Sequence, residues 1–275
     1  MSTLYCIGEV CMTLSPALPQ ADSLETAVDF RAAPGGAAAE LAAAYARQGG
    51  QAALLARLGD DPFGQRLTSG LKAQGVDVSG VELIPGGASP VLFDSPETSV
   101  FHPGELFRFP PEELDLNFLS DASGLVFTGT GLQDCPLRYA QLRAVNAARD
   151  AGVPVSFLPA VRSALWPSHE ILRQTLLAFL ARADLLFLSE EELELLYGTR
   201  ELRVALFPLF SGPARLIACA GADKVQLVTR EHYAEFPASR PLPEIAATVL
   251  TQLKSEQVSL AGISRWNPSR MERMG

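Results

Sequence analysis

The sequence predicts an α/β fold in three layers, with a mostly parallel sheet between two layers of helices. Short apolar segments typical of buried strands alternate with segments of helical period through most of the chain. The 275 residues suffice for one large domain with a sizeable core, and no shift in composition marks a second domain. Hydrophobic residues make up 48% of the chain and charged residues 19%, which indicates a globular protein. We therefore expect a single α/β domain over residues 1–275.

Each strand is expected where a short apolar segment is bounded by residues that favour turns. By this criterion the strands lie at residues 4–10, 52–58, 124–128, 153–157, 184–188 and 215–220. Parallel pairing is expected for them because the helices between them can return the chain to the same edge of the sheet.

Helices are expected at residues 36–48, 62–74, 137–151 and 169–181, where apolar residues recur with a period of 3.6. Asp61 and Pro62 predict the start of the second helix, as N-cap and first-turn residue, and Gly75 predicts its end.

The C-terminal part of the chain departs from the alternation. Residues 224–229 and 232–236 predict a hairpin, and residues 244–255 predict an amphipathic helix that caps the domain. Residues 257–275 are expected to form a flexible tail. The alternative is an anchor for a protein partner, because Trp266 lies among arginines and both residue types are enriched at interfaces.

The charge of the chain argues against one class of partner. Lys and Arg number 22 against 31 Asp and Glu, a net charge of −9. Because phosphate backbones attract basic surfaces, we expect no nucleic-acid partner.

The chain is also expected to act away from membranes. No uninterrupted apolar run approaches the 18 or so residues of a membrane-spanning helix, and the N-terminus lacks the basic start of a signal peptide. Cys6, Cys11, Cys135 and Cys219 are scattered without metal-binding spacing, so buried thiols in a reducing compartment are expected. These observations together predict a cytoplasmic protein.

Residues 34–80 contain an ordered series of glycine and acidic signals. Gly35-Gly36 opens a helix of small residues, Gly49-Gly50 closes it, and the sequence LGDDPFG follows at 58–64. In order and spacing this segment resembles the ribokinase/fructokinase (PfkB-type) carbohydrate kinases. The resemblance implies a ribokinase-like, Rossmann-like α/β/α fold with a small β-sheet lid.

Two stretches that interrupt the strand and helix alternation, at about 13–33 and 88–108, match the places of this lid. In the family such a lid covers the sugar and often pairs with its twin, which implies a homodimer. The open edge of a small sheet gives a physical reason for such pairing. The second stretch is short, so the completeness of the lid stays open.

The resemblance also assigns the substrate side of the site. Thr13 stands where the family has the Asp that binds sugar hydroxyls, and Glu40 stands at the usual Asn after Gly35 and Gly36. Glu40 has a second interpretation as an acid that stabilises the start of a helix. Arg162 matches an anion-binding Arg of the family, or it forms a salt bridge within its loop.

On the nucleotide side, the family's NxxE motif becomes a sequence that begins with Ser189 and ends with Glu192. Residues 190–192 are expected to form a solvated first helical turn, and metal contact is the alternative. The TxGxxG motif becomes a sequence with Gly221 and, in place of its second glycine, Lys224. No metal site can be assigned from histidine or cysteine spacing.

The catalytic motif of the family is missing from the sequence. The resemblance implies a C-terminal DTxGAGD motif whose last Asp accepts the hydroxyl proton, and residues 237–275 contain no aspartate. No catalytic residue is therefore assigned. We interpret the chain as an inactive sugar-kinase homologue that binds a protein partner, itself or a small molecule and needs no cofactor.

An active fructokinase-like kinase using ATP and Mg²⁺ is the alternative, and a frameshifted or internally deleted gene product would have the same sequence features.

Overall fold

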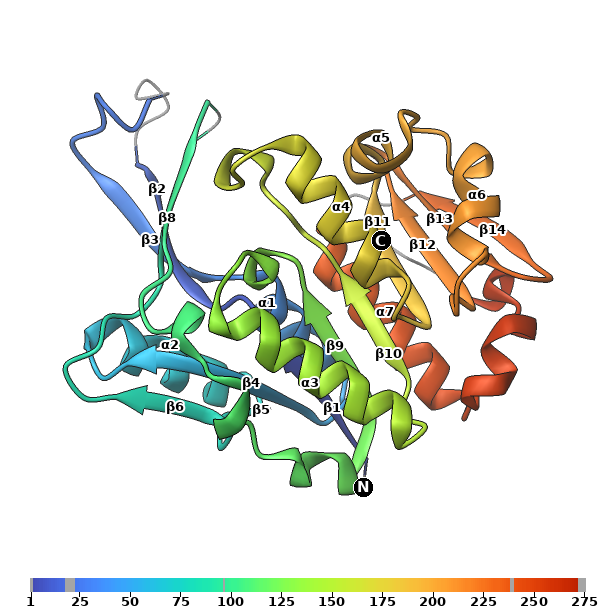
Figure 1. Ribbon diagram of the computed structural model, residues 1–275, viewed down its shortest axis with the longest axis horizontal. Helices are drawn as coiled ribbons and strands as arrows, with labels where there is room; N and C mark the ends of the chain where they lie inside the picture. The colour runs from blue at the N-terminus through green and yellow to red at the C-terminus, as the bar shows by residue number, and fades with distance from the viewer. Residues whose placement is uncertain (1, 18–22, 96, 238–239, 272–275) are drawn as a thin grey trace.

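The computed structural model describes residues 2–17, 23–95, 97–237 and 240–271, and its central feature is a mostly parallel sheet (Figure 1). In these residues ten strands form that sheet, in the order β14-β13-β12-β11-β10-β9-β1-β4-β5, with β6 also paired to β4. They are β1 (Thr3–Ile7), β4 (Ala52–Gly59), β5 (Val76–Asp77), β6 (Val81–Ile84), β9 (Ala122–Thr128), β10 (Val155–Leu158), β11 (Leu185–Ser189), β12 (Leu216–Ala220), β13 (Lys224–Thr229) and β14 (Tyr233–Pro237). Only β12-β13 and β13-β14 pair antiparallel among these strands. The predicted fold class is confirmed.

The helices cover both faces of the sheet. They are α1 (Ala37–Arg47), α2 (Pro62–Ala73), α3 (Pro136–Asp150), α4 (His169–Leu180), α5 (Glu190–Tyr197), α6 (Leu202–Phe210) and α7 (Leu242–Ser255). From β1 the chain moves through α1 to β4, and from β9 it moves the opposite way through α3 to β10. Because such crossovers are right-handed, α1 and α3 lie on opposite faces (Figure 1).

The core is built from leucine, alanine and phenylalanine side chains of the sheet and the inner helix faces. Phe127 and Phe157 on neighbouring strands stack with ring centroids 4.4 Å apart. Helix α1 approaches the sheet closely because its buried face consists mainly of alanines. Asp61 caps α2 as predicted, since its carboxylate accepts a hydrogen bond from the Gly64 N–H at 2.8 Å.

A second, smaller sheet stands away from the main one and forms the expected lid (Figure 1). In the described residues its order is β3-β2-β7-β8, from β2 (Cys11–Pro16), β3 (Phe30–Gly35), β7 (Val91–Asp94) and β8 (Ser99–His102). Residues 18–22 and 96, which belong to the expected lid stretches, lie outside the described part. Both excursions therefore contribute a pair of strands, including the second, short one.

The C-terminal residues differ from the flexible tail expected over 257–275. Short 3-10 turns at Leu260–Arg265 and Pro268–Arg270 follow α7, and Ile263, Trp266 and Met271 are buried. The Trp266 indole N–H donates to Glu256 at 2.9 Å, and the Trp266 carbonyl accepts from Thr229. Trp266 therefore packs within its own chain; residues 272–275 lie outside the described part.

None of the helices in the described residues combines the length and the apolar character needed to cross a lipid bilayer.

Candidate functional site

The strand order brings the residues that follow β1 and β9 together at the carboxyl ends of these two strands. These strands are neighbours, and the chain leaves them in opposite directions. In an open parallel sheet, such a reversal leaves a crevice where ligands bind. Glu9 follows β1 at this edge, and Thr130 follows β9.

Glu9 is the buried acid of this crevice. The Thr130 hydroxyl donates to Glu9 Oε2 at 2.7 Å, and the Glu9 N–H donates to the Thr128 hydroxyl at 3.1 Å. The Cys11 thiol lies 3.8 Å from Glu9 Oε1. Burial raises the pKa of Glu9, and the Thr130 hydrogen bond and the nearby charge of Arg162 offset part of that effect.

The two glycines before α1 bring the backbone into the same crevice. Gly36 has φ of 104°, and a Cβ there would lie 2.5 Å from the carbonyl oxygen of Glu9. Only glycine meets both conditions. Gly35 lies against the Thr13 side chain, so residues 13, 35 and 36 lie close together.

Glu40 reaches the same glycines from the first turn of α1. A Cβ on Gly35 would lie 3.6 Å from Glu40 Oε1, and the nearby Gly36 backbone favours the charged form of the carboxylate, which lowers its pKa. Glu40 thus lies in the first turn of α1 and, together with Gly35, lines a cavity of about 350 Å³ that extends to Arg47 and Glu244. Its side chain remains open to solvent, yet the surrounding atoms desolvate the carboxylate and raise its pKa.

Arg162 connects the loop after β10 to the lid. Its Nη2 lies 3.1 Å from Asp94 Oδ2 on β7, and both side chains are partly exposed. Arg162 therefore forms a salt bridge, but its partner Asp94 belongs to the lid and not, as expected, to the loop of Arg162. Since the charge of Arg162 also acts on Glu9 and Glu40, the crevice contains one cation among three carboxylates.

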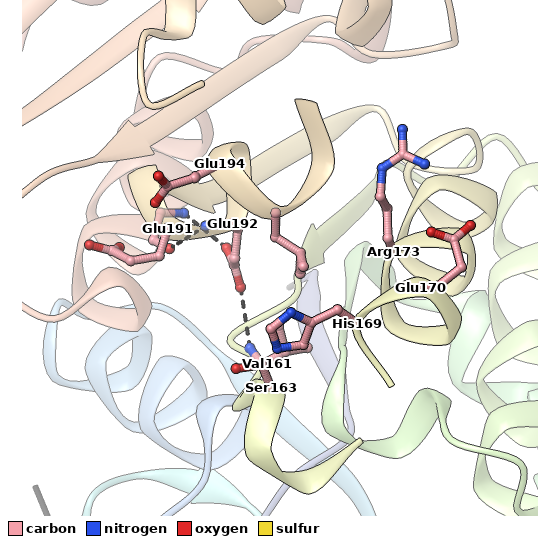
Figure 2. Close-up of a pocket in the computed structure, with 10 residues that line it drawn as sticks. Val161, Ser163, His169, Glu170, Arg173, Glu191, Glu192 and Glu194 are labelled. Atoms are coloured by element: carbon pink, nitrogen blue, oxygen red, sulfur yellow. Dashed lines mark hydrogen bonds between the residues drawn. The ribbon is translucent and has the colours of Figure 1, made fainter. Parts of the chain in front are cut away.

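A cavity of about 510 Å³ lies beside this crevice, between the loop after β10 and helices α4 and α5 (Figure 2). Ser189 and Glu192, two of the predicted nucleotide-side residues, line it. Its charged lining consists of His169 and Arg173 against four glutamates, namely Glu170, Glu191, Glu192 and Glu194.

Glu192 is buried in the wall of this cavity and has a structural role, contrary to the expected solvated turn. Its carboxylate accepts from the Val161 N–H at 3.2 Å and from the Ser189 N–H at 2.9 Å, while the Ser189 hydroxyl accepts from the Glu192 N–H (Figure 2). This reciprocal capping box starts α5 and ties it to the loop after β10. Burial raises the pKa of Glu192 to about 7.

The other two nucleotide-side residues are not brought to this cavity. Lys224 forms an ion pair with Glu235 at 3.4 Å across the β13-β14 hairpin. Gly221 lies against Glu190, whose Oε1 would be 2.5 Å from a Cβ at that position. Neither residue lines the cavity. Within the described ranges, no three His, Cys, Asp or Glu side chains converge as a metal site.

Comparison with known proteins identifies the family. The family model described as "pfkB family carbohydrate kinase" matches residues 1–242. The chain belongs to the pfkB family of carbohydrate kinases.

Among the relatives of this pfkB-family chain are plant fructokinases. Fructokinase-1 of Zea mays is 36% identical over 198 residues, which are 70% of this chain and 61% of the relative. Fructokinase-2 of Solanum lycopersicum is 32% identical over 206 residues, 72% of this chain and 62% of the relative. The matched part thus spans less than two thirds of the length of these relatives.

Solved structures agree with the fold. A fructokinase with bound ATP from Xylella fastidiosa has a TM-score of 0.82 at 25% identity, over 96% of this chain and 84% of that chain. A PfkB protein from Polaromonas sp. JS666 has a TM-score of 0.80 at 23% identity, over 96% and 93% of the two chains. The latter likeness concerns the fold alone.

Sequence reasoning missed several contributors to the site of this pfkB-family chain. Thr128, Thr130 and Asp94 were not proposed, and no role was assigned to Glu9. The available signal was position, because Thr128 and Thr130 end or follow an apolar strand predicted to be parallel. Asp94 had no such signal, since its partner lies 68 residues away.

Proposed function

We propose that this chain acts as a carbohydrate kinase of the fructokinase type, which transfers a phosphoryl group from ATP to a sugar hydroxyl. The main support is the assembly of Glu9, the Gly35-Gly36 turn, Glu40 and Arg162 at one crevice beneath the lid. These residues come from separate segments of the chain. Fructokinases are 32–36% identical to this chain over about 70% of its length, which supports the same substrate class.

On the acceptor side, the proposal gives Glu40 the role of general base. It is an accessible carboxylate next to the glycine turn, and its raised pKa brings it closer to the range in which a carboxylate accepts a proton effectively. Glu9, held by Thr130, would accept a hydrogen bond from a second sugar hydroxyl. Arg162 would then hold the lid over the sugar through Asp94.

On the donor side, the cavity beside Ser189 and Glu192 is the proposed place for the nucleotide phosphates. The cavity lining has four carboxylates but only His169 and Arg173 as basic residues, so its negative charge would repel a triphosphate unless a divalent cation binds with it. Mg²⁺ commonly binds through substrate phosphates and few protein carboxylates. ATP and Mg²⁺ would therefore arrive together.

A second candidate function is sugar binding without phosphoryl transfer. It is favoured by the sequence after β14, where no Gly-Ala-Gly-Asp occurs and the next helix, α7, begins at Leu242 after Pro241. The earlier expectation of inactivity remains a prediction of this candidate. In it, the lid sheet persists because it also pairs with a second copy of the chain.

One set of measurements separates the two candidates. ADP formation is followed with MgATP and fructose, ribose or glucose, and sugar binding is measured in parallel by calorimetry without nucleotide. Sugar-dependent turnover that falls by about 100-fold or more in Glu40→Gln supports the kinase and its base. Sugar binding without turnover supports the second candidate, and the absence of both contradicts each of them. Glu231→Gln, at an exposed residue of the turn between β13 and β14 at the opposite edge of the sheet, is the matched control.

A further inference from the structure

A second cavity lies at the opposite edge of the main sheet from the candidate site. Its volume is about 290 Å³, and it is lined at the amino ends of four adjacent strands by residues such as Leu4 of β1, Ser156 of β10 and Leu185 of β11. Helix α7 and the turn after it close the cavity with Leu250, Leu253 and Ile263. The crevice of the proposed kinase lies at the carboxyl ends of the same strands.

The walls of this cavity are mainly apolar and well buried. Leu4, Leu185, Leu253 and Ile263 are each at most 6% exposed. The Ser123 hydroxyl is buried in the lining and makes no hydrogen bond within the described residues. The Tyr45 hydroxyl lies near the Ser123 hydroxyl, but the two groups do not form a well-aligned hydrogen bond. A buried hydroxyl without a partner loses free energy that a ligand oxygen would restore.

The charge of the lining points to one class of ligand. Lys254 is the cation of the lining, and none of the lining residues is Asp or Glu, although the whole chain has a net charge of −9. In the described residues Lys254 contacts a backbone carbonyl, that of Ser2 at 3.4 Å, and the face of the Tyr45 ring at 5.6 Å. It has no carboxylate partner there, and its side chain is exposed to solvent.

We propose that this cavity binds a small amphipathic monocarboxylic acid. The carboxylate pairs with Lys254 and accepts a hydrogen bond from Ser123, and the hydrocarbon tail fills the space among Leu4, Leu185 and Leu253. An apolar cavity of about 150 Å³ holds one benzene molecule, so a cavity of about twice that volume accepts a tail of about six to eight carbons. The site is separate from the sugar crevice and does not depend on the proposed kinase activity.

The probe for this site is sodium octanoate, titrated without sugar or nucleotide into the unmodified chain. Binding is measured by calorimetry and by methyl chemical shifts of the leucines. Saturable binding with shifts at Leu250 and Leu253 is the expected result. Across butanoate, hexanoate and octanoate, each added methylene should improve affinity by about fourfold, and dodecanoate should gain nothing more because the cavity is full.

Variants test the two halves of the ligand. Lys254→Gln should weaken octanoate by about tenfold, as expected for the loss of a charge-assisted contact, and leave the neutral probe octan-1-ol unchanged. Leu250→Phe should weaken both probes because the larger ring occupies the cavity. Lys72→Gln, at an exposed lysine of α2, should change neither.

Two outcomes overturn the proposal. One is the absence of saturable octanoate binding at millimolar concentration. The other is equal loss of octanoate and octanol in Lys254→Gln, which would show that the substitution disturbs packing and that no carboxylate is recognised.

Discussion

Replacing Glu192 by Gln should change how the stability of the protein depends on pH. The Glu192 carboxyl is buried at the start of α5, and its pKa is raised to about 7 from the usual 4.5. Between these values the unfolded chain has lost the proton while the folded chain keeps it. Rising pH therefore lowers the free energy of unfolding of the unmodified protein, and the loss is complete above the folded-state pKa.

The expected magnitude follows from the two pKa values. Between pH 5 and pH 8 the free energy of unfolding contributed by Glu192 falls by about 2.5 kcal/mol, and a Gln at this position has no such dependence. Glu192→Gln also loses one acceptor for a backbone N–H, a cost of about 1 kcal/mol at every pH. Because part of the Glu192 contribution is already lost at pH 5, the variant should be about as stable as the unmodified protein at pH 5 and more stable by about 2 kcal/mol at pH 8.

Urea unfolding followed by circular dichroism at several pH values is the appropriate assay. Glu191→Gln serves as control, since it makes the same substitution at the neighbouring, exposed residue of the same helix turn. If the difference in unfolding free energy between Glu192→Gln and the unmodified protein were the same at pH 5 and pH 8, the reasoning about buried protonation would be refuted.

Three further substitutions test packing, backbone geometry and association. Ala42→Leu places a larger side chain on the fully buried face of α1 and should lower the free energy of unfolding by about 1–3 kcal/mol in urea titrations. Gly36→Ala puts a Cβ against the Glu9 carbonyl at a φ of 104°, so the free energy of unfolding should fall by about 1–3 kcal/mol and sugar should bind more weakly. Unchanged stability would contradict the described turn. Val28 and Val100 are exposed apolar residues of the lid. If the lid mediates self-association, the double substitution Val28→Asp and Val100→Asp should convert a dimer to a monomer in sedimentation and leave the main domain folded. A monomeric unmodified protein would exclude the association.

Most of the main sheet and helices α1 to α4 and α7 could be predicted from local pattern, whereas the short strands β5 and β6 and helix α6 were not predicted. Strands such as β4 and β9 are mainly apolar segments, and Asp61 and Pro62 mark the start of α2. Each of these elements is therefore specified by residues within or next to it. The Gly35-Gly36 turn was also predictable, since glycine is required where the backbone approaches Glu9 closely.

The contacts that join distant segments could not be predicted in the same way. Thr130 binds Glu9 across 121 residues, and Asp94 binds Arg162 across 68, so neither partner is indicated by sequence spacing. Glu192 is a different case: Ser189 and Glu192 have the spacing of a capping box, a local signal that the acidic neighbours obscured. Burial of Trp266 depends on the hairpin and α7 together, so its local basic neighbours were misleading.

The packing of α7 against α1 has a consequence for how the chain folds during its synthesis. Arg47 pairs with Glu244, and Gln48 donates to Thr248 across 200 residues, so α1 obtains these neighbours only when the last helix leaves the ribosome. Until then the glycine turn and Glu40, both anchored to α1, rest on an incompletely covered helix. The order of translation thus delays completion of the crevice until α7 has docked, and a nascent chain stalled before residue 242 should remain bound to chaperones.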